Sequence, residues 1–425
     1  MLDVMVVGAG VAGLSAAAGL RAAGMSCAVL EAAGRVGGRA WTVDLAGAAV
    51  DLGASWLHDA ARNPLAGIAR AAGDGLIDSD ARRVRRVMVA GRPASPEDLA
   101  AYGQAWQRFE AAADAERGDL PFAEILARLG EDPWAATIGT WEACLIAAAD
   151  PRQFSLLDWR LNRLEGRNLS VAGGLGALVI RRLLPEAGQV RCDTPVTRLR
   201  WGDAVEADTP AGSVRARAAI VTVSTGVLAA GGIAFDPALP APVQAAIEGL
   251  PMGLLSKVIL VATGADRLGL AADTSVQHRV AADSWTRGDG TMFFHAWPQG
   301  GAHVVGFVGG PAAWALARAG RAATEDFARA QLRRVFGARA DAALRAQAVT
   351  AWGEDPWQRG AYAYARPGAA GARALLGQPL ADGRLVFAGE AVRTDGLAGT
   401  VGGAWLSGQA AARGVVAALR ATPRP

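Results

Sequence analysis

Lysine is almost absent from this sequence of 425 residues. The chain carries 43 lysine and arginine residues, and Lys257 is the single lysine among them. An alanine-, glycine- and arginine-rich composition explains why arginine supplies nearly all the positive charge. It does not explain why the one lysine stands inside the apolar stretch "GLLSKVILV". Lys257 is therefore the first candidate for a functional residue.

Cysteine and long apolar runs are also scarce. Cys27, Cys144 and Cys192 are widely spaced, and neither a CxxC pair nor a Cys/His zinc pattern occurs, so we predict no metal site. No apolar stretch reaches the ~18 residues that cross a bilayer, and no charged leader with a cleavage site begins the chain. We expect a protein of a reducing compartment, the cytoplasm, without a membrane partner.

The chain is only mildly basic, which is weak evidence for a nucleic-acid partner. Lysine and arginine total 43 and aspartate and glutamate 40, which gives a net charge of +3. The densest basic run, "ARRVRRV" at 81–87, lacks the interleaved aromatic residues of a single-strand binder. We predict a solvated edge strand or loop there and no nucleic-acid partner. The hydrophobic fraction of 52% supports a large core, and the length predicts two domains or one α/β domain with insertions.

The first 32 residues predict a βαβ unit. "DVMVV" and "SCAVLEA" are typical of buried strands, and "LSAAAGLRAAG" between them is typical of a helix that ends at Gly24. Residues 95–165 are mostly helical in pattern, strands return near 190–223 and 256–263, and the chain closes with strand, turn and helix. We therefore predict an α/β fold, a Rossmann-type domain with a parallel sheet interleaved with an α+β domain.

A dinucleotide motif connects the first strand to the first helix. Gly8, Gly10 and Gly13 form G-x-G-x-x-G, in which the glycines allow a tight turn, close approach of a pyrophosphate and close helix–strand packing. Glu31 ends the second strand, where a carboxylate can accept hydrogen bonds from ribose hydroxyls. NAD and FAD both fit this pattern.

The next two stretches extend the site. "EAAGRVGGRA" places Arg35 and Arg39 around Gly37 and Gly38, a combination suited to a pyrophosphate held from a second side. "VDLGASWLHD", residues 50–59, offers small side chains that could admit a flat ring system.

Eight stretches in order resemble flavin-dependent amine oxidases, the group that holds monoamine oxidases, polyamine oxidases and lysine-specific demethylases. They are "VVGAGVAGLSAA", "LEAAGRVGGRAWT", "DLGASWLH", "VAGGLGAL", "IVTVSTGVLAAGGIAFDPALP", "MGLLSKVIL", "WGEDPWQRGAYAY" and "LVFAGEAVRTDGLAGTVGGAWLSGQAAA". The third and the last are most similar to the polyamine oxidases. The resemblance implies an FAD-binding domain at 1–75, 168–238 and 380–425 and a substrate-binding domain at 76–167 and 239–379.

The resemblance also implies the cofactor contacts. Glu31 would bind the adenosine ribose, Val196 would meet adenine through its backbone, and Glu390 would hold the ribityl end. The full expected set is Gly8, Gly10, Val11, Ala12, Gly13, Glu31, Ala32, Arg35, Gly38, Arg39, Gly53, Ala54, Ser55, Trp56, Val196, Glu390, Thr400 and Val401. Monoamine oxidases carry a flavin-linking cysteine where Ala361 stands here, so we predict non-covalent FAD.

The catalytic residues follow from the same resemblance. Lys257 would reach the flavin N5 edge through a water, and burial on an apolar strand should lower the pKa of its ammonium. Trp352, Trp357 and Tyr362 would wall the substrate site, with Thr400 where monoamine oxidases have a second tyrosine. His58 would lie beside the substrate amine. A polyamine also carries ammonium groups distant from the reacting carbon. We assign no acidic partner to them, because no motif supports the two candidates, Asp59 and Asp283.

The expected activity is oxidation of a C–N bond of a primary or secondary, polyamine-like amine. Hydride would pass to flavin N5, oxygen would become hydrogen peroxide, and the imine would be hydrolysed. An L-amino-acid oxidase on the same scaffold stays open, since arginines that could clamp a carboxylate are abundant. An oxygen-independent flavin dehydrogenase or desaturase also stays open. The expected partners are a small amine and O2, and the chain is expected to be a monomer or a homodimer.

Overall fold

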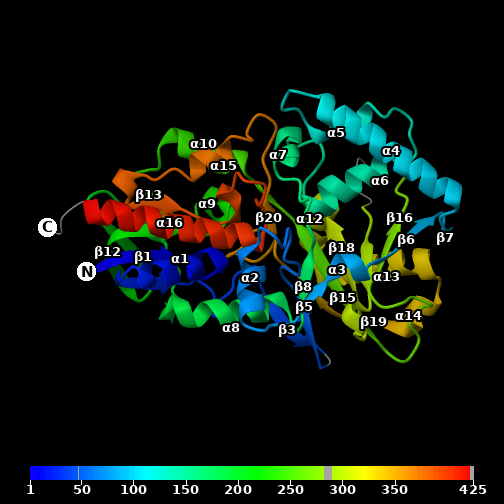
Figure 1. The fold of residues 1–425 in the computed structure, drawn as a ribbon, viewed down its shortest axis with the longest axis horizontal. Coiled ribbons are helices and arrows are strands. Elements are labelled where there is room, and N and C mark those ends of the chain that lie inside the picture. Colours follow the sequence, from blue (N-terminus) through cyan, green and yellow to red (C-terminus); the bar gives the residue numbers. More distant parts are fainter. Residues whose placement is uncertain (46, 282–289, 422–425) are drawn as a thin grey trace.

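Two β-sheets organise the chain. The structure is a computed structural model that describes residues 1–45, 47–281 and 290–421. The sheets lie in opposite halves of the molecule, and the N-terminus and the last described helix, α16 (Val401–Ala421), lie in the half that holds the first sheet (Figure 1). The α/β architecture predicted from the sequence is confirmed.

The first sheet has a parallel centre. Its strands run in the order β13 (Ala234–Asp236), β10 (Arg198–Arg200), β11 (Val205–Thr209), β12 (Gly212–Val221), β1 (Leu2–Val7), β2 (Cys27–Leu30) and β9 (Val190–Arg191), with β21 (Leu385–Phe387) paired to β12. β1 is parallel to both β12 and β2, as the βαβ pattern predicts, whereas β11 is antiparallel to β10 and β12.

Helices cover both faces of this sheet because side chains alternate along β1. Val4 and Val6 belong to a core with α1 (Val11–Ala22), α2 (Pro64–Ala71), α8 (Leu175–Ala187) and α16 (Val401–Ala421). Met5 and Val7 belong to a second core on the other face, with α10 (Ala241–Gly249) and α15 (Ala372–Leu376). The N-terminus of α1 thus lies directly beyond the end of β1.

The second sheet is mainly antiparallel. Its order is β19 (Leu344–Val349), β15 (Leu255–Ala262), β18 (His303–Gly309), β17 (Phe293–Ala296), β16 (Thr274–His278), β6 (Val84–Val89) and β7 (Arg92–Pro93), and β6 and β16 form its one parallel pair within the described residues. One face packs on α12 (Gly310–Ala319), α13 (Arg321–Phe336) and α14 (Arg339–Ala343). The opposite face is left to line a cavity.

A helical layer stands over that cavity. It contains α4 (Pro96–Ala115), α5 (Phe122–Ala127), α6 (Ala135–Gly139), the π-helix η1 (Thr140–Ile146) and α7 (Leu156–Leu161). Phe109, Phe122 and Trp159 are central to its aromatic core. Short pieces complete the fold: β3 (Thr42–Leu45) with β4 (Ala48–Asp51), β5 (Leu76–Asp78) with β8 (Leu169–Val171), β14 (Met252–Gly253) with β20 (Tyr362–Ala363), and helices α3 (Ser79–Arg82) and α9 (Thr225–Ala229).

The two sheets can be compared with the expected domain segments. Every strand of the first sheet lies within 1–75, 168–238 or 380–425, and every strand of the second within 76–167 or 239–379. The helices α10 and α15 differ from that division, since Val243, Ile247 and Leu376 pack in the core of the first sheet. Their apolar faces gave no signal of which sheet they would cover.

Candidate active site

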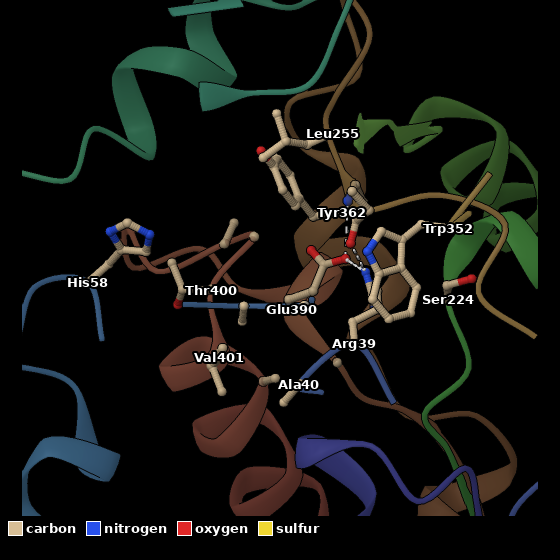
Figure 2. Close-up of a pocket in the computed structure, with 18 of the residues that line it drawn as sticks. Arg39, Ala40, His58, Ser224, Leu255, Trp352, Tyr362, Glu390, Thr400 and Val401 are labelled. Carbon is tan, nitrogen blue, oxygen red and sulfur yellow. Dashed lines mark hydrogen bonds and ion pairs between the residues drawn. The ribbon is translucent and has the colours of Figure 1, made fainter. Parts of the chain in front are cut away.

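One cavity of about 770 Å³ runs from the first sheet to the second. The glycine turn after β1 lies at one end, and the open face of the second sheet with η1 and α7 lies at the other. Nearly all the residues expected to bind a cofactor or substrate line it, although they come from segments spread over the whole chain. Figure 2 shows several of them around one space, from His58 on one side to Trp352 on the other.

The glycines of the motif have distinct surroundings. A Cβ on Gly13 would lie 1.9 Å from the carbonyl oxygen of Gly8, so a side chain there would force helix and strand apart. A Cβ on Gly10 would meet nothing within 4 Å, and Gly10 lines the cavity with Val11 and Ala12. Gly10 provides no side-chain cap, so the first N–H groups of α1 are free to bind an anion.

Glu31 lies where β2 ends. Its carboxylate accepts hydrogen bonds from the backbone N–H of Ala9 at 2.6 Å and of Ala33 at 2.8 Å. Burial raises the pKa of this carboxyl, and these hydrogen bonds oppose the rise. Ala32 and Val196 line the cavity beside it. The carboxylate is therefore fixed in orientation before any ligand arrives.

The two arginines of the second glycine stretch have different environments. Arg39 lines the cavity and forms an ion pair with Glu390 at 2.8 Å, visible in Figure 2. Arg35, which we expected at the cofactor, is not among the cavity-lining residues of this structure. Its guanidinium lies 4.4 Å from the ring centroid of Trp41 and donates to the backbone oxygen of Gly38. The guanidinium of Arg35 therefore already has a cation–π partner and a hydrogen-bond acceptor in this structure.

Glu390 is the buried acid of the site. Its Oε1 accepts from Arg39 and from the backbone N–H of Ala363 at 3.1 Å, whereas its buried Oε2 has no hydrogen-bond partner among the described residues. A buried carboxylate oxygen without a partner is costly, so a donor from a bound molecule would satisfy it. The start of α16 adjoins this acid, with Thr400 and Val401 lining the cavity.

Thr400 has a structural task in addition to its place in the cavity wall. Its hydroxyl donates to the backbone oxygen of Leu397 at 2.7 Å and accepts from the backbone N–H of Gly403 at 2.9 Å. The side chain of Thr400 is thereby held as an N-terminal cap on α16. It does not provide the aromatic surface that a tyrosine would provide at this position.

Lys257 is buried, as the apolar stretch indicated. Its Nζ lies 2.8 Å from the backbone oxygen of Asp51, 2.5 Å from that of Gly53 and 2.6 Å from Oγ of Ser55. Burial lowers the pKa of the ammonium to about 8. Three oxygens take the three N–H donors, so a water that bridges Lys257 to a ligand would replace one of them, and Ser55 Oγ is the one that can rotate away.

Aromatic side chains form the walls. Trp352 is buried and donates to the backbone oxygen of Leu52 at 3.3 Å, and the hydroxyl of Tyr362 donates to the backbone oxygen of Leu145 at 3.2 Å. Trp357 lines the cavity but is 40% exposed, so it lies at the rim. Trp56, expected as a cofactor contact, lies between two histidines, with ring centroids 6.2 Å from both His58 and His295.

The open face of the second sheet contributes residues that sequence analysis missed. Residues two apart along a strand share a face. Lys257, Phe307 and Phe293 lie opposite one another on three neighbouring strands, and His295 and Ser275 form the adjoining pair, so all five line the cavity wall. The signal that could have found His295 is the alternation in "MFFHAW", but the sequence alone did not show which strand lies beside it.

The π-helix η1 supplies the other missed group, Glu142. Its carboxylate lines the cavity and accepts from Nε1 of Trp159 at 2.8 Å, and burial raises its pKa. π-helical turns are frequent at functional sites. Arg83 and Arg85 from the basic run at 81–87 also line the cavity, so this run is only partly the solvated surface that we expected.

Of the two acids named for a distant ammonium group, the structure describes one, Asp59. Asp59 pairs with Arg62 at 3.0 Å and is not among the cavity-lining residues. Asp283 lies outside the described residues. Across the described ranges, no cluster of His, Cys, Asp or Glu could hold a metal, and no helix is long and apolar enough to cross a membrane.

Comparison with known proteins identifies the family. The model described as flavin containing amine oxidoreductase matches residues 11–416. The chain belongs to this family. It is 30% identical to probable polyamine oxidase 4 of Arabidopsis thaliana, over 97% of this chain and 86% of that one. It is also 30% identical to lysine-specific histone demethylase 1 homolog 1 of Oryza sativa subsp. japonica, over 98% of this chain and about half, 52%, of that longer protein.

The fold agrees with this membership. A structure of putrescine oxidase bound to putrescine superposes with a TM-score of 0.80 at 22% identity, covering 98% of this chain and 99% of that one. The amine oxidase family implies a flavin, and the cavity suits one. Gly10 leaves open space for phosphates, and the partnerless Oε2 of Glu390 can accept from a hydroxyl or ring N–H.

Proposed function

We propose that this chain is an FAD-dependent oxidase of primary or secondary amines, polyamine-like in substrate. The observation that carries the proposal is the single cavity in which a nucleotide-type glycine turn, Glu31, Glu390 and the buried Lys257 meet an aromatic chamber. FAD, when bound, would supply the two-electron chemistry that converts the amine and oxygen into an imine, which water hydrolyses, and hydrogen peroxide.

The residues would divide the work along the cavity. The first turn of α1 would bind the pyrophosphate, with Arg39 beside it, and Glu31 would accept from the ribose. Trp352 and Tyr362 would keep the amine in a water-poor space, where a neutral amine is favoured. Lys257 would place a positive charge near the reacting ring and favour the charge that develops when oxygen is reduced.

We propose that FAD is held without a covalent bond. Among the described residues, no cysteine lines the cavity, and Ala361 and Tyr362 stand where a flavin-linking cysteine would be expected. Denaturing the yellow protein should therefore release all its flavin into the supernatant, and flavin that stays with the precipitated chain would contradict this point.

One observation favours a second candidate, an L-amino-acid oxidase. Arg83, Arg85 and Arg163 also line the cavity, and one guanidinium can bind a carboxylate through two parallel hydrogen bonds. Glu142 in the same region favours a cation instead. The second charged group of the substrate would be a carboxylate in the first case and an ammonium in the other, so it would carry opposite charges in the two cases.

A peroxide assay separates the candidates. Purified yellow protein is given putrescine, spermine, acetylated polyamines, arylalkylamines and L-amino acids, and hydrogen peroxide is followed. We expect turnover with amines. Turnover of amino acids alone would select the second candidate, and flavin that is reduced by an amine but stays reduced for minutes in air would indicate an oxygen-independent dehydrogenase. A cytoplasmic location and a monomeric or dimeric state remain part of the proposal.

A further inference from the structure

Two histidines flank Trp56 in the cavity wall, and they differ in their surroundings. The ring centroids of His58 and His295 both lie 6.2 Å from that of Trp56. Burial lowers the pKa of His58, which opposes uptake of a proton. His295, on β17, instead has a carboxylate beside it, because its Nε2 lies 3.8 Å from Oδ1 of Asp273. A nearby carboxylate favours the charged imidazolium over the neutral ring.

Asp273 is held as an anion directly before β16. Its Oδ2 accepts from Nε of Arg82 at 2.9 Å, and its Oδ1 accepts from the backbone N–H of Gln299 at 2.7 Å. Burial tends to raise the pKa of this carboxyl, but its contacts with His295, Gln299 and Arg82 lower it to about 2. Asp273 is buried and is not among the cavity-lining residues, whereas the side chain of Arg82 is 47% exposed. The carboxylate therefore connects the ring in the cavity wall to the surface.

The second sheet places His295 among the residues expected to contact substrate. Ser275 lies opposite His295, and Phe293, two residues before it, lies opposite Phe307. The ring of His295 lines the cavity and makes no hydrogen bond of ordinary length within the described residues. The other titratable groups on the elements around it are His303 on β18, Lys257 on β15, Arg85 on β6 and His58 beyond Trp56. All four are neutral or positive, so Asp273 supplies the negative charge that a protonated ring needs.

The substrate amine needs a proton acceptor in the cavity. Its nitrogen lone pair must form the new C=N bond, so only the neutral amine can lose hydride from the adjacent carbon. An aliphatic amine with an ordinary pKa of about 10.4 is neutral in only about 1 molecule in 2,500 at pH 7. Imidazole is the side chain that exchanges a proton most readily near neutral pH. A histidine in the cavity wall can therefore make the abundant ammonium form a substrate.

We propose that His295 takes a proton from the ammonium group of the substrate, with Asp273 as the positioning residue that stabilises the charged ring. A carboxylate only accepts hydrogen bonds, so the hydrogen of the neutral ring belongs on Nε2, which faces Asp273, and Nδ1 receives the proton. The N–H bond of the ammonium breaks, its electron pair stays on the amine nitrogen, and the ring later returns the proton to solvent. This role rests on the amine oxidation proposed above.

The pH dependence of flavin reduction tests the role of His295. Anaerobic stopped-flow mixing of the holoenzyme with a primary alkylamine gives the rate of flavin reduction in wild type and in His295→Gln. At pH 7 we expect the variant to be slower by roughly 10²- to 10³-fold, the usual contribution of a proton acceptor. The ratio of the two rates should fall toward 1 as the pH approaches the amine pKa of about 10.4, because a free amine needs no acceptor. Taking this ratio cancels the titration of groups common to both proteins, Lys257 among them.

A second variant keeps the ring and removes the charge beside it. Asp273 has a φ of 57°, a conformation that asparagine also tolerates, so Asp273→Asn preserves the backbone. We expect a loss of roughly 10-fold at pH 7, which declines with rising pH in the same way. The control is His303→Phe, which removes a buried histidine from β18 that is not among the cavity-lining residues. Any loss of rate in this control should be the same at every pH.

Two results would separate failure of this inference from failure of the proposed function. If amines reduce the wild-type flavin, a rate ratio that is the same at pH 7 and pH 10 for His295→Gln and Asp273→Asn would overturn the role of His295 alone. If no amine reduces the wild-type flavin at any pH, the proposed function is rejected and this role is rejected with it.

Discussion

Within the part of the chain that the structure describes, Lys257 forms no ion pair, although the charge of Asp51 acts on its ammonium. Two backbone oxygens and the Ser55 hydroxyl hold its ammonium, and the ring of Phe307 lies 5.6 Å away. Dipoles of this kind stabilise a charge less completely than an ion pair does, which is consistent with its lowered pKa. A charge held in this way is available to interact with a ligand, and two predictions follow at this position.

Replacing Lys257 with methionine should leave the flavin bound and slow its reoxidation. Because removal of one charge that stabilises a developing anion typically costs about 10²-fold in rate, we expect an effect of roughly that size on the reaction of reduced enzyme with oxygen. Stopped-flow mixing of the reduced protein with oxygen measures it. Arg345→Met removes an exposed cation from the same sheet and serves as the control. Equal reoxidation rates for the two variants would reject this role.

The same lysine should make stability depend on pH. Its ordinary pKa of 10.5 falls to about 8 in the folded protein. Between these values the unfolded chain binds more protons at this site than the native state, so the free energy of unfolding should rise with pH across this window, by up to about 3 kcal/mol. Below about pH 8 Lys257 is protonated in both the folded and the unfolded state, so the folded protein bears the full cost of burying its charge.

Urea unfolding at several pH values, for wild type and Lys257→Met, isolates this contribution as the difference between the two proteins. The difference should change through pH 8 to 10.5 and be flat below that range. A difference that does not vary with pH would show that the ammonium is better solvated than the structure indicates.

At the scale of elements, the π-helix η1 decides which side chains of the helical layer reach the cavity. Its wider turn brings Trp141, Glu142 and Leu145 to the cavity wall together. Glu142 is held there by Nε1 of Trp159 on α7. A buried carboxylate beside an aromatic wall suits an ammonium group, so we propose Glu142 as the acidic partner that the sequence did not reveal.

Glu142→Gln should therefore weaken binding of a cationic amine. Loss of one charge-assisted hydrogen bond is worth about 1.5–3 kcal/mol, so the KM for a diamine should rise by roughly 10- to 100-fold while kcat changes less. Glu124→Gln, an exposed acid on α5, is the matched control. An unchanged KM for the diamine in Glu142→Gln would show that the ammonium binds elsewhere.

The elements also show where sequence patterns stop being informative. The glycine turn, the helix after it and the strand around Lys257 could be predicted because local periodicity and turn residues specify them. The π-helix could not, since "EACLIAAA" is apolar at nearly every position and marks no face. Arg85 reaches the cavity because β6 pairs with β16, and Ser275 lies opposite it nearly 200 residues later. Such distant pairings have no local signal.

At the scale of the whole molecule, the cavity depends on contacts that join separate cores. Arg373 on α15, in the core of the first sheet, forms a buried ion pair with Asp158 on α7 of the helical layer, with Nε to Oδ1 at 2.7 Å and Nη2 to Oδ2 at 2.8 Å. The guanidinium also donates to the backbone oxygens of Ala363 and Ala391. Both side chains line the cavity, so this pair connects its two ends.

Asp158→Ala should destabilise the protein by about 3–5 kcal/mol, because it leaves the guanidinium of Arg373 buried without its counter-charge. Urea unfolding of the holoenzyme measures the change. The control is Arg152→Ala, which removes an ion pair with Asp150 near the surface and should cost no more than ~1 kcal/mol. A loss for Asp158→Ala as small as that of the control would mean that water reaches Arg373 and that the helical layer is held to the first sheet by apolar packing alone. In that case Asp158→Ala should also keep its full affinity for the flavin, which a titration of the apoprotein would show.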